Sequence, residues 1–525
     1  MHRLAPCLLP LLLAACAHEA VPPPAAGSPF ALDDASVAEL QAAMRDGRLS
    51  ARQLTTLYLE RIAALDDDGP RLNAVIEINP DALAEAERLD AERTAGRVRG
   101  PLHGIPVLLK DNIDATGMAN SAGSLALAEH RPARDAHLVA RLREAGAVIL
   151  GKTNLSEWAN FRSTRSVSGW SGRGGQTRNP YVLDRNPCGS SAGSGVAVAA
   201  GLAPLAVGTE TNGSIICPAA VNGVVGIKPT VGLVSRHGII PISPSQDTAG
   251  PMAQRVADAA ALLGALAGAD PRDPATEAAE AHLVPDYTAF LDADALRGAR
   301  IGVMRKAMGF HSEVDRVMEA SIAALRVAGA EIVDPADLPS HGRFGKHAFE
   351  VLLYEFRPAL EDYLADSGAP LRTLEALMAF NTAHAEHELR WFGQELFEMA
   401  AKKGPLTEAA YLEARDSARR LAGREGIDAA MDAHRLDALL TTAVGPAWPI
   451  DPVNGDHFLG AGYSAAAVAG YPSITVPAGE VHGLPVGVVF IGRAFSEPRL
   501  IALAHAFEQA TRARRPPRLL PTLAP

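Results

Sequence analysis

Apolar side chains recur at two different spacings along this chain of 525 residues. Segments with apolar positions three or four residues apart alternate with short runs that are apolar at almost every position. The runs at 105–110, 147–152 and 484–492 predict buried strands, and the intervening segments predict helices. This alternation indicates an α/β fold in which helices cover a sheet.

Two helices near the start carry capping signals. Ser36 and Ser50 are followed three positions later by Glu39 and Gln53, which is the spacing of a capping box. Helices are also expected at 81–95, 135–146, 195–202 and after 492, strands at 72–78 and 474–479, and a loop at 170–195.

From about residue 270 to 430 the pattern changes to long helices with few strands, which predicts a mostly helical portion packed on a mixed sheet. Residues 36–525 contain no low-complexity break, so we expect one large domain that includes this portion. The helical portion and the loop at 156–176 are natural candidates for lining a pocket.

The first residues have the pattern of an export signal. Arg3 precedes a short apolar run at 8–13, which is too short to cross a bilayer, and small residues surround Cys16. We expect residues 1–15 to be a signal peptide and 16–35 to be a linker.

The four residues ending in Cys16 (LAAC) resemble a lipobox, so Cys16 is the candidate lipidated first residue of an envelope or periplasmic lipoprotein. The same stretch also fits ordinary signal cleavage, and free secretion is the alternative. A lipid at this position would be the protein's one contact with a membrane.

The net charge of −11 comes without any concentrated basic stretch, which argues against a nucleic-acid partner. We expect a monomer. Of the four cysteines, Cys7 and Cys16 belong to the expected signal region. An oxidising compartment would permit a bridge between Cys188 and Cys217, but two separate buried thiols are the favoured prediction because the sequence contains no distance.

The stretch from 188 to 230 is the most informative for chemistry. It holds several serines among glycines and a second Gly-Ser pair, Gly213-Ser214. Glycines let backbone N–H groups converge on a reacting carbonyl, as an oxyanion hole requires. A connecting turn with no catalytic role is the alternative.

Several familiar motifs are excluded. Residues 189–193 match G-x-S-x-G, but the prolines at 180 and 187 argue against the strand that this motif needs. His384 and His387 share a helix face without a third ligand in pattern, and there is no H-E-x-x-H or Walker A sequence. We expect no metal and no organic cofactor.

Lys110 ends the apolar run at 105–110. A buried lysine loses its proton more readily, because desolvation disfavours the ammonium, and the neutral amine can act as a base. Alternatively, Lys110 reaches solvent or pairs with Asp111.

These stretches, taken in order, resemble the amidase-signature family from about residue 36 to the end. The matching stretches are GIPVLLKDNI, GKTNLSEWANF, QTRNP, CGSSAGS and GTETNGSI. The similarity is strongest to bacterial peptide amidases, which release ammonia from the C-terminal amide of peptides; it rests on SGWSGRGGQTRNPY, LLYEF and AAAVAGYPSITVP. The resemblance implies an α/β fold with a mixed twisted sheet, helices on both faces and a mostly helical additional portion.

The resemblance also implies roles for individual residues. Lys110 falls on the family's base, Ser190 on its bridging serine and Ser214 on its nucleophile, with a cis peptide bond at Gly189–Ser190. The implied oxyanion hole is formed by the backbone of Thr211, Asn212, Gly213 and Ser214.

Two residues depart from the commoner family pattern. Glu210 stands where Asp is usual, and Asn212 stands where Gly is usual. If the hole needs an unusual backbone angle at 212, Asn is among the better non-glycine choices.

The implied reaction forms an acyl-enzyme on Ser214 and releases ammonia from a small amide or peptide amide. A broader aryl or aliphatic amidase is the alternative. A non-catalytic envelope binding protein is a more remote one.

Overall fold

The computed structural model describes residues 32–523, and the expected signal peptide and most of the expected linker lie outside them. The described residues form one compact unit that begins at Leu32. It begins four residues before the expected boundary at 36, because Leu32 is buried and the Asp33 carbonyl accepts a hydrogen bond from Gln254 at 2.9 Å. Within the described part of the chain, no helix has both the length and the apolar character needed to cross a membrane.

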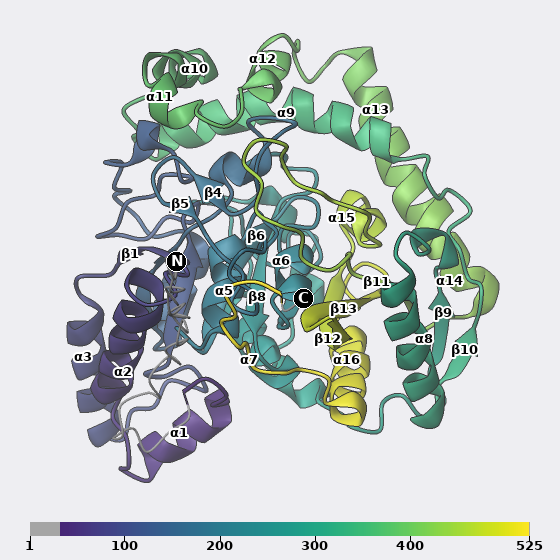
Figure 1. Cartoon of the computed structure of the whole chain (residues 1–525), viewed down its shortest axis with the longest axis horizontal. Coiled ribbons are helices and arrows are strands. Elements are labelled where there is room, and N and C mark those ends of the chain that lie inside the picture. The colour runs from purple at the N-terminus through teal and green to yellow at the C-terminus, as the bar shows by residue number, and fades with distance from the viewer. Residues whose placement is uncertain (1–31, 524–525) are drawn as a thin grey trace, which may run out of the picture. The chain divides into compact units, whose positions relative to one another are not determined.

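An 11-stranded mixed sheet forms the centre of this unit, in the order β1-β3-β2-β6-β8-β7-β12-β13-β11-β9-β10 (Figure 1). The strands are β1 Val75–Ile78, β2 Pro106–Lys110, β3 Val148–Thr153, β4 Trp170–Ser171, β5 Gly175–Gln176, β6 Leu205–Glu210, β7 Val225–Lys228, β8 Thr248–Ala253, β9 Arg300–Val303, β10 Glu331–Val333, β11 Ala438–Thr442, β12 Ser473–Val481 and β13 Leu484–Ile491. Strands β4 and β5 pair separately. The predicted α/β class and mixed sheet are confirmed.

Helices surround the sheet (Figure 1). They are α1 Val37–Arg45, α2 Ala51–Ile62, α3 Ala82–Thr94, α4 His137–Glu144, α5 Ala192–Ala199, α6 Ile216–Val221, α7 Val256–Leu266, α8 Ser312–Val327, α9 Gly345–Asp366, α10 Leu374–Ala383, α11 Ala385–Glu388, α12 Glu395–Ala401, α13 Ala409–Ala422, α14 Ala429–His434, α15 Ser464–Ala469 and α16 Glu497–Thr511. Ser36 and Ser50 form the predicted capping boxes of α1 and α2.

Lys110 ends β2, and the neighbours of β2 in the sheet are β3 and β6. Strand β2 pairs in parallel with both β3 and β6, and every residue of the three strands is buried. Strands with both faces covered read as continuous apolar runs, which is why β2 and β3 could be predicted, whereas β6 was not.

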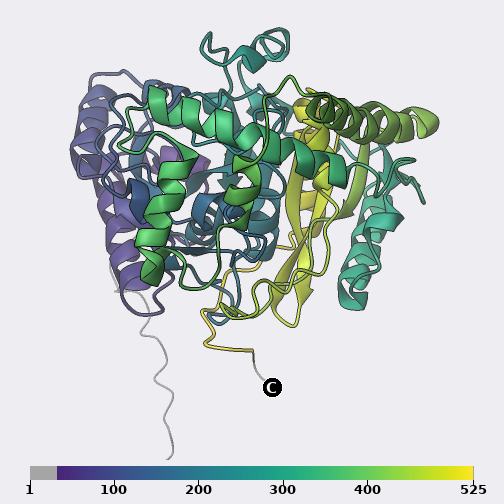
Figure 2. The same ribbon diagram turned by 90° about the horizontal axis from the view of Figure 1, so that it is seen from above.

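Helices α9 to α13 lie along one side of the molecule, at the top of Figure 1 and facing the viewer in Figure 2. The segment 270–430 is mostly helical as predicted, but it also supplies β9 and β10, which extend one edge of the sheet. These strands of four and three residues are too short to show a period in the sequence.

Three glutamates join these helices to the rest of the unit. Glu355 of α9 accepts a hydrogen bond from the Ser243 hydroxyl at 2.6 Å. Glu388 of α11 accepts one from Ser124 at 3.1 Å, and Glu395 of α12 accepts one from Ser163 at 2.7 Å. Aromatic contacts reinforce the junction, as in the rings of Phe161 and Phe356, whose centroids are 5.0 Å apart.

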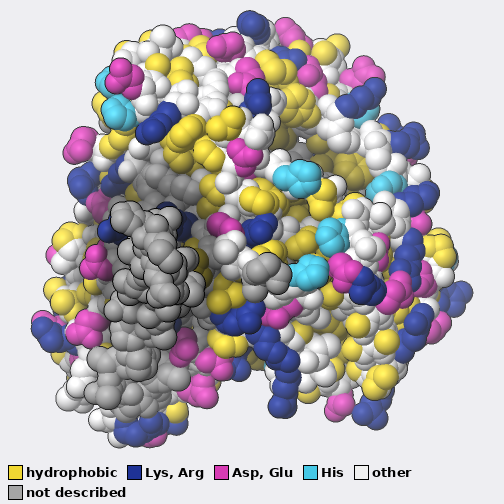
Figure 3. Space-filling view, in the orientation of Figure 1, with side chains coloured by type: hydrophobic (Ala, Val, Ile, Leu, Met, Phe, Trp, Pro, Cys, Tyr) yellow, Lys and Arg dark blue, Asp and Glu magenta, His cyan; other side chains and the backbone are white. Residues whose placement is uncertain are grey.

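On the face drawn in Figure 3, acidic and basic side chains are interspersed.

Candidate active site

Lys110 ends β2, and its side chain is fully buried. Its Nζ atom donates hydrogen bonds to Ser190 Oγ at 2.7 Å, to Thr209 Oγ1 at 2.9 Å and to the Thr209 carbonyl oxygen at 3.3 Å. Burial lowers the pKa of Lys110 to about 7, and the carboxylates of Glu210 and Asp247 oppose this shift. A substantial fraction of the amine is therefore neutral near pH 7, as a proton acceptor requires.

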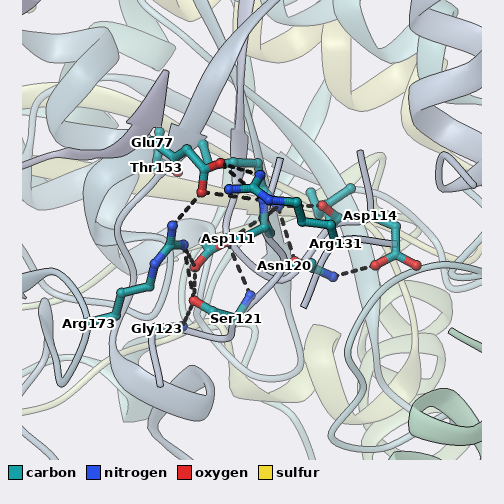
Figure 4. Close-up of polar contacts among 12 residues, drawn as sticks. Glu77, Asp111, Asp114, Asn120, Ser121, Gly123, Arg131, Thr153 and Arg173 are labelled. Carbon is teal, nitrogen blue, oxygen red and sulfur yellow. Dashed lines mark hydrogen bonds and ion pairs between the residues drawn. The ribbon is translucent and has the colours of Figure 1, made fainter. Parts of the chain in front are cut away.

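The neighbouring Asp111 carboxylate belongs to a different cluster. It lies 3.4 Å from Lys152 Nζ and 3.2 Å from Arg173 Nη1, and it accepts a hydrogen bond from the Ser121 hydroxyl (Figure 4). The alternative in which Lys110 reaches solvent or pairs with Asp111 is therefore wrong.

Ser190 lies on the loop before α5 and is fully buried. The peptide bond Gly189–Ser190 is cis, as the resemblance implied. The Ser190 carbonyl accepts a hydrogen bond from the Ser156 N–H at 3.0 Å, while its hydroxyl faces Lys110. The structure thus brings two of the three expected catalytic side chains into direct contact.

Ser214 lies in the turn between β6 and α6 and is 9% exposed. Gly213 has a φ of +87°, and a Cβ atom there would lie 2.3 Å from the Tyr463 ring. Asn212, by contrast, has no positive φ, and its side-chain oxygen accepts a hydrogen bond from Ser464 Oγ at 3.0 Å. The unusual backbone angle therefore falls on Gly213, and residue 212 does not have to be glycine.

Cys188 and Cys217 form a disulfide bond, so the favoured prediction of two separate thiols is wrong. The bond joins the segment that leads to Ser190 with the helix that follows Ser214. Close by, the Ser191 N–H donates a hydrogen bond to the Ser214 carbonyl at 3.1 Å. The two serine-bearing segments are thus held together both covalently and by the backbone.

The two serine hydroxyls do not contact each other directly. Within residues 32–523, the Ser214 hydroxyl makes no hydrogen bond to Ser190. In the same described region, the backbone N–H groups of Asn212, Gly213 and Ser214 have no protein acceptor. Only the Lys110–Ser190 half of the expected relay is a hydrogen bond here, and the N–H groups beside Ser214 are free for a developing oxyanion.

Three polar residues around Lys110 were not predicted. Thr209 accepts hydrogen bonds from Lys110 and, at 3.0 Å, from the side-chain amide of Asn112. The Ser191 hydroxyl donates to the Thr209 carbonyl at 3.0 Å. A single threonine in an apolar strand gives no signal of such a role, whereas Ser191 was visible as part of the CGSSAGS stretch.

A small cavity lies beside this polar cluster. Asn112 and Thr209 line it together with Thr211, Asp247 and Ala159. The Thr211 hydroxyl donates to Asp247 Oδ1 at 2.6 Å. Ala159 comes from the loop at 156–176, so this predicted pocket element does reach the cavity.

A groove of about 610 Å³ lies between the helical portion and the rest of the unit. Glu355 of α9, Tyr411 of α13 and Phe495 contribute to its walls, together with Pro244 and Ser245. Pro244, Ser245 and Asp247 belong to one short loop. This loop therefore lines the groove through Pro244 and Ser245 and the small cavity through Asp247.

Comparison with known proteins places these features in context. Residues 53–501 match the Amidase family. A probable amidase of Arabidopsis thaliana is 42% identical over 509 residues, which cover 94% of this chain and 93% of the relative.

Solved structures and further relatives show the same similarity. The structure of native peptide amidase from Stenotrophomonas maltophilia is 60% identical with a TM-score of 0.91, and the match covers 94% of this chain and 100% of that one. A glutamyl-tRNA(Gln) amidotransferase subunit from Halorhodospira halophila is 37% identical over 508 residues, with 91% of this chain and 97% of the relative covered.

Proposed function

The chain belongs to the amidase family and is an amide hydrolase, and on this premise we propose that it releases ammonia from the C-terminal amide of peptides. The similarity to a peptide amidase at 60% identity over nearly the whole chain supports this substrate class. The hydrogen bond from a buried Lys110, whose pKa is lowered to about 7, to Ser190 is the observation that carries the mechanism.

In the proposed reaction, neutral Lys110 accepts a proton from Ser190 while Ser190 accepts one from Ser214. Ser214 Oγ attacks the amide carbonyl, and the N–H groups of residues 211–214 stabilise the oxyanion. The proton returns through the relay to the leaving nitrogen, so that ammonia departs and an ester to Ser214 remains. Water, deprotonated by the same relay, then hydrolyses the ester and releases the acid.

The second proton transfer requires the hydroxyls of Ser190 and Ser214 to approach each other. Catalytic hydrogen bonds are often long without substrate and shorten when it binds. The disulfide and the Ser191–Ser214 backbone bond already hold the two segments together. We infer that rotation of the Ser214 side chain brings the two hydroxyls into contact.

The test is ammonia release from an amidated dipeptide by the purified protein, with aryl and aliphatic amides beside it. We expect the peptide amide to have the highest kcat/KM, and Ser214→Ala to lower it by about 10⁴-fold or more. A preference for aryl or aliphatic amides would favour the broader amidase. No hydrolysis of any of these amides would favour a binding protein.

We also propose that the protein is an exported monomer, tethered through a lipid on Cys16. The pattern of residues 1–16 supports this, as does the disulfide, since such bonds are rare in a reducing cytoplasm. Fractionation of cells expressing the protein should place it in the membrane pellet, and Cys16→Ser should move it to the soluble envelope fraction. Light scattering of the soluble form measures its oligomeric state.

A further inference from the structure

Glu210 lies between the strand that carries Thr209 and the turn that carries Ser214. It is the last residue of β6, directly after Thr209, and its side chain is 1% exposed. Four residues further along the chain is Ser214.

One carboxylate oxygen of Glu210 holds this turn. Oε2 accepts hydrogen bonds from the N–H groups of Ile215 at 2.8 Å and Ile216 at 3.0 Å. These are the two backbone donors that follow Ser214, while the N–H groups of residues 212–214 keep no protein acceptor within the described chain. Glu210 thus takes up the donors beyond the nucleophile and leaves those before it open.

The other carboxylate oxygen of Glu210, Oε1, does not hold the turn. Oε1 is buried and has no hydrogen-bond partner among the described residues, and Glu210 makes no ion pair there. A buried carboxylate with one free oxygen retains a strong local field. Such a charge acts on nearby ionisable groups.

Two buried lysines and a tyrosine face this charge. Glu210 is the main opposing influence on the burial-lowered pKa of Lys110, with a smaller contribution from Asp247. It acts in the same sense on Lys228, whose pKa burial lowers to about 8 and which Glu497 also faces. On the other side Glu210 adds to the raised pKa of Tyr463, whose main cause is burial.

We propose that Glu210 is a positioning residue for the hydrolysis: its carboxylate fixes the turn that carries Ser214 and supplies the buried negative charge that Lys110 faces. This inference rests on the proposed function. The length of the side chain matters, because an aspartate at 210 would hold its oxygens about 1.5 Å further from the two N–H groups.

Two substitutions separate the two roles. Glu210→Gln keeps an oxygen acceptor for Ile215 and Ile216 but removes the charge. Because loss of a negative charge lowers the pKa of Lys110, we expect the acidic limb of kcat/KM to move to lower pH by about one unit. Glu210→Asp keeps the charge but retracts it from the turn. We expect kcat to fall by about tenfold to a hundredfold, with the limb closer to its wild-type position.

Glu497→Gln is the matched control. Glu497 is also 1% exposed and also accepts a backbone hydrogen bond, from Thr230 at 2.6 Å, but it acts on Lys228 and not on Lys110. Its acidic limb should stay where the wild type has it. Thermal melting of each variant confirms that folded proteins are compared.

The outcomes distinguish this inference from the proposed function. A wild type that hydrolyses none of the amides contradicts the function itself. If the wild type hydrolyses them, two results overturn the role of Glu210 alone. One is an acidic limb of kcat/KM that does not move in Glu210→Gln, and the other is an equal displacement of the limb in Glu497→Gln. A limb that moves only in Glu210→Gln, together with a lower kcat in Glu210→Asp, supports both roles.

Discussion

Lys110 shows how burial changes what a side chain can do. Its pKa of about 7 means that the protonated form, which cannot accept a proton, predominates below this pH. We therefore expect kcat/KM to fall about tenfold for each pH unit below the limb near pH 7. A pH–rate profile, with stability checked at each pH, measures this. A limb below pH 5 would point to a carboxylate as the base.

Gly213 is the residue where the backbone leaves least freedom. We expect Gly213→Ala to abolish most activity, because its φ of +87° is strained for alanine and the new methyl group would meet the Tyr463 ring. Gly298→Ala is the control: Gly298 has a φ of +74°, but nothing lies within 4 Å of the new atom. Both variants should lose about 1 kcal/mol from backbone strain, and only Gly213→Ala should lose hydrolysis. Equal activity in the two would remove the steric explanation.

At the residue scale, the sequence marked candidate residues but not their contacts. The apolar strand that ends on Lys110 and the glycines around Ser190 and Ser214 made these three residues candidates, and the family resemblance supplied their expected roles. Thr209 and Asn112 could not be found, because a hydrogen-bond partner brought close by sheet pairing has no local pattern. The positive φ was expected, if anywhere, at 212, and it lies at Gly213.

The loop before α5 and the helix α6 form the unit that the disulfide closes. Cys188 and Cys217 are 29 residues apart, and by chain entropy a bridge of this span stabilises the fold by about 3 to 4 kcal/mol. We expect the double variant Cys188→Ser, Cys217→Ser to melt several degrees lower and to lose part of its activity, because the two serine segments are less firmly held. Calorimetry of the variant beside the reduced wild type measures this. Identical melting of the variant and the oxidised wild type would contradict it.

The strands β1, β2, β3, β12 and β13 and the two capped helices lie where they were expected. The sequence did not predict β6, β7, β8 and β11, nor β9 and β10, which have only four and three residues. The disulfide was missed for another reason. Pairing across 29 residues depends on how α5 and α6 pack, which no spacing records.

At the scale of the whole unit, Asp258 of α7 connects two helices that lie far apart in the sequence. Its carboxylate accepts a hydrogen bond from the Val37 N–H at the start of α1, and burial raises its pKa to about 7. The folded state therefore holds this proton more tightly than the unfolded chain. Its contribution to stability is full below the ordinary carboxyl pKa of about 4 and is lost as the pH rises through 7.

We expect Asp258→Asn to melt a few degrees higher than the wild type at pH 9 and not at pH 4, because the amide keeps the bond to Val37 without a buried charge. Glu60→Gln, at an exposed position of α2, is the control. Scanning calorimetry at the two pH values measures the difference. A variant less stable at pH 9 would show that the charge is compensated by its surroundings.

The residues of the proposed chemistry and the helices that border the groove come from separate parts of the chain, and this has a consequence for how such a protein diversifies. The residues of the proposed chemistry come from 110–214, while the helices that border the groove come from 345–422 and are joined to the remainder through Glu355, Glu388 and Glu395. A foreign helical cassette would have to preserve these three acceptors, and with them the buried contacts of Phe356 and Tyr363, to leave the reaction centre undisturbed. New substrate ranges could then arise by recombination, with the relay inherited intact.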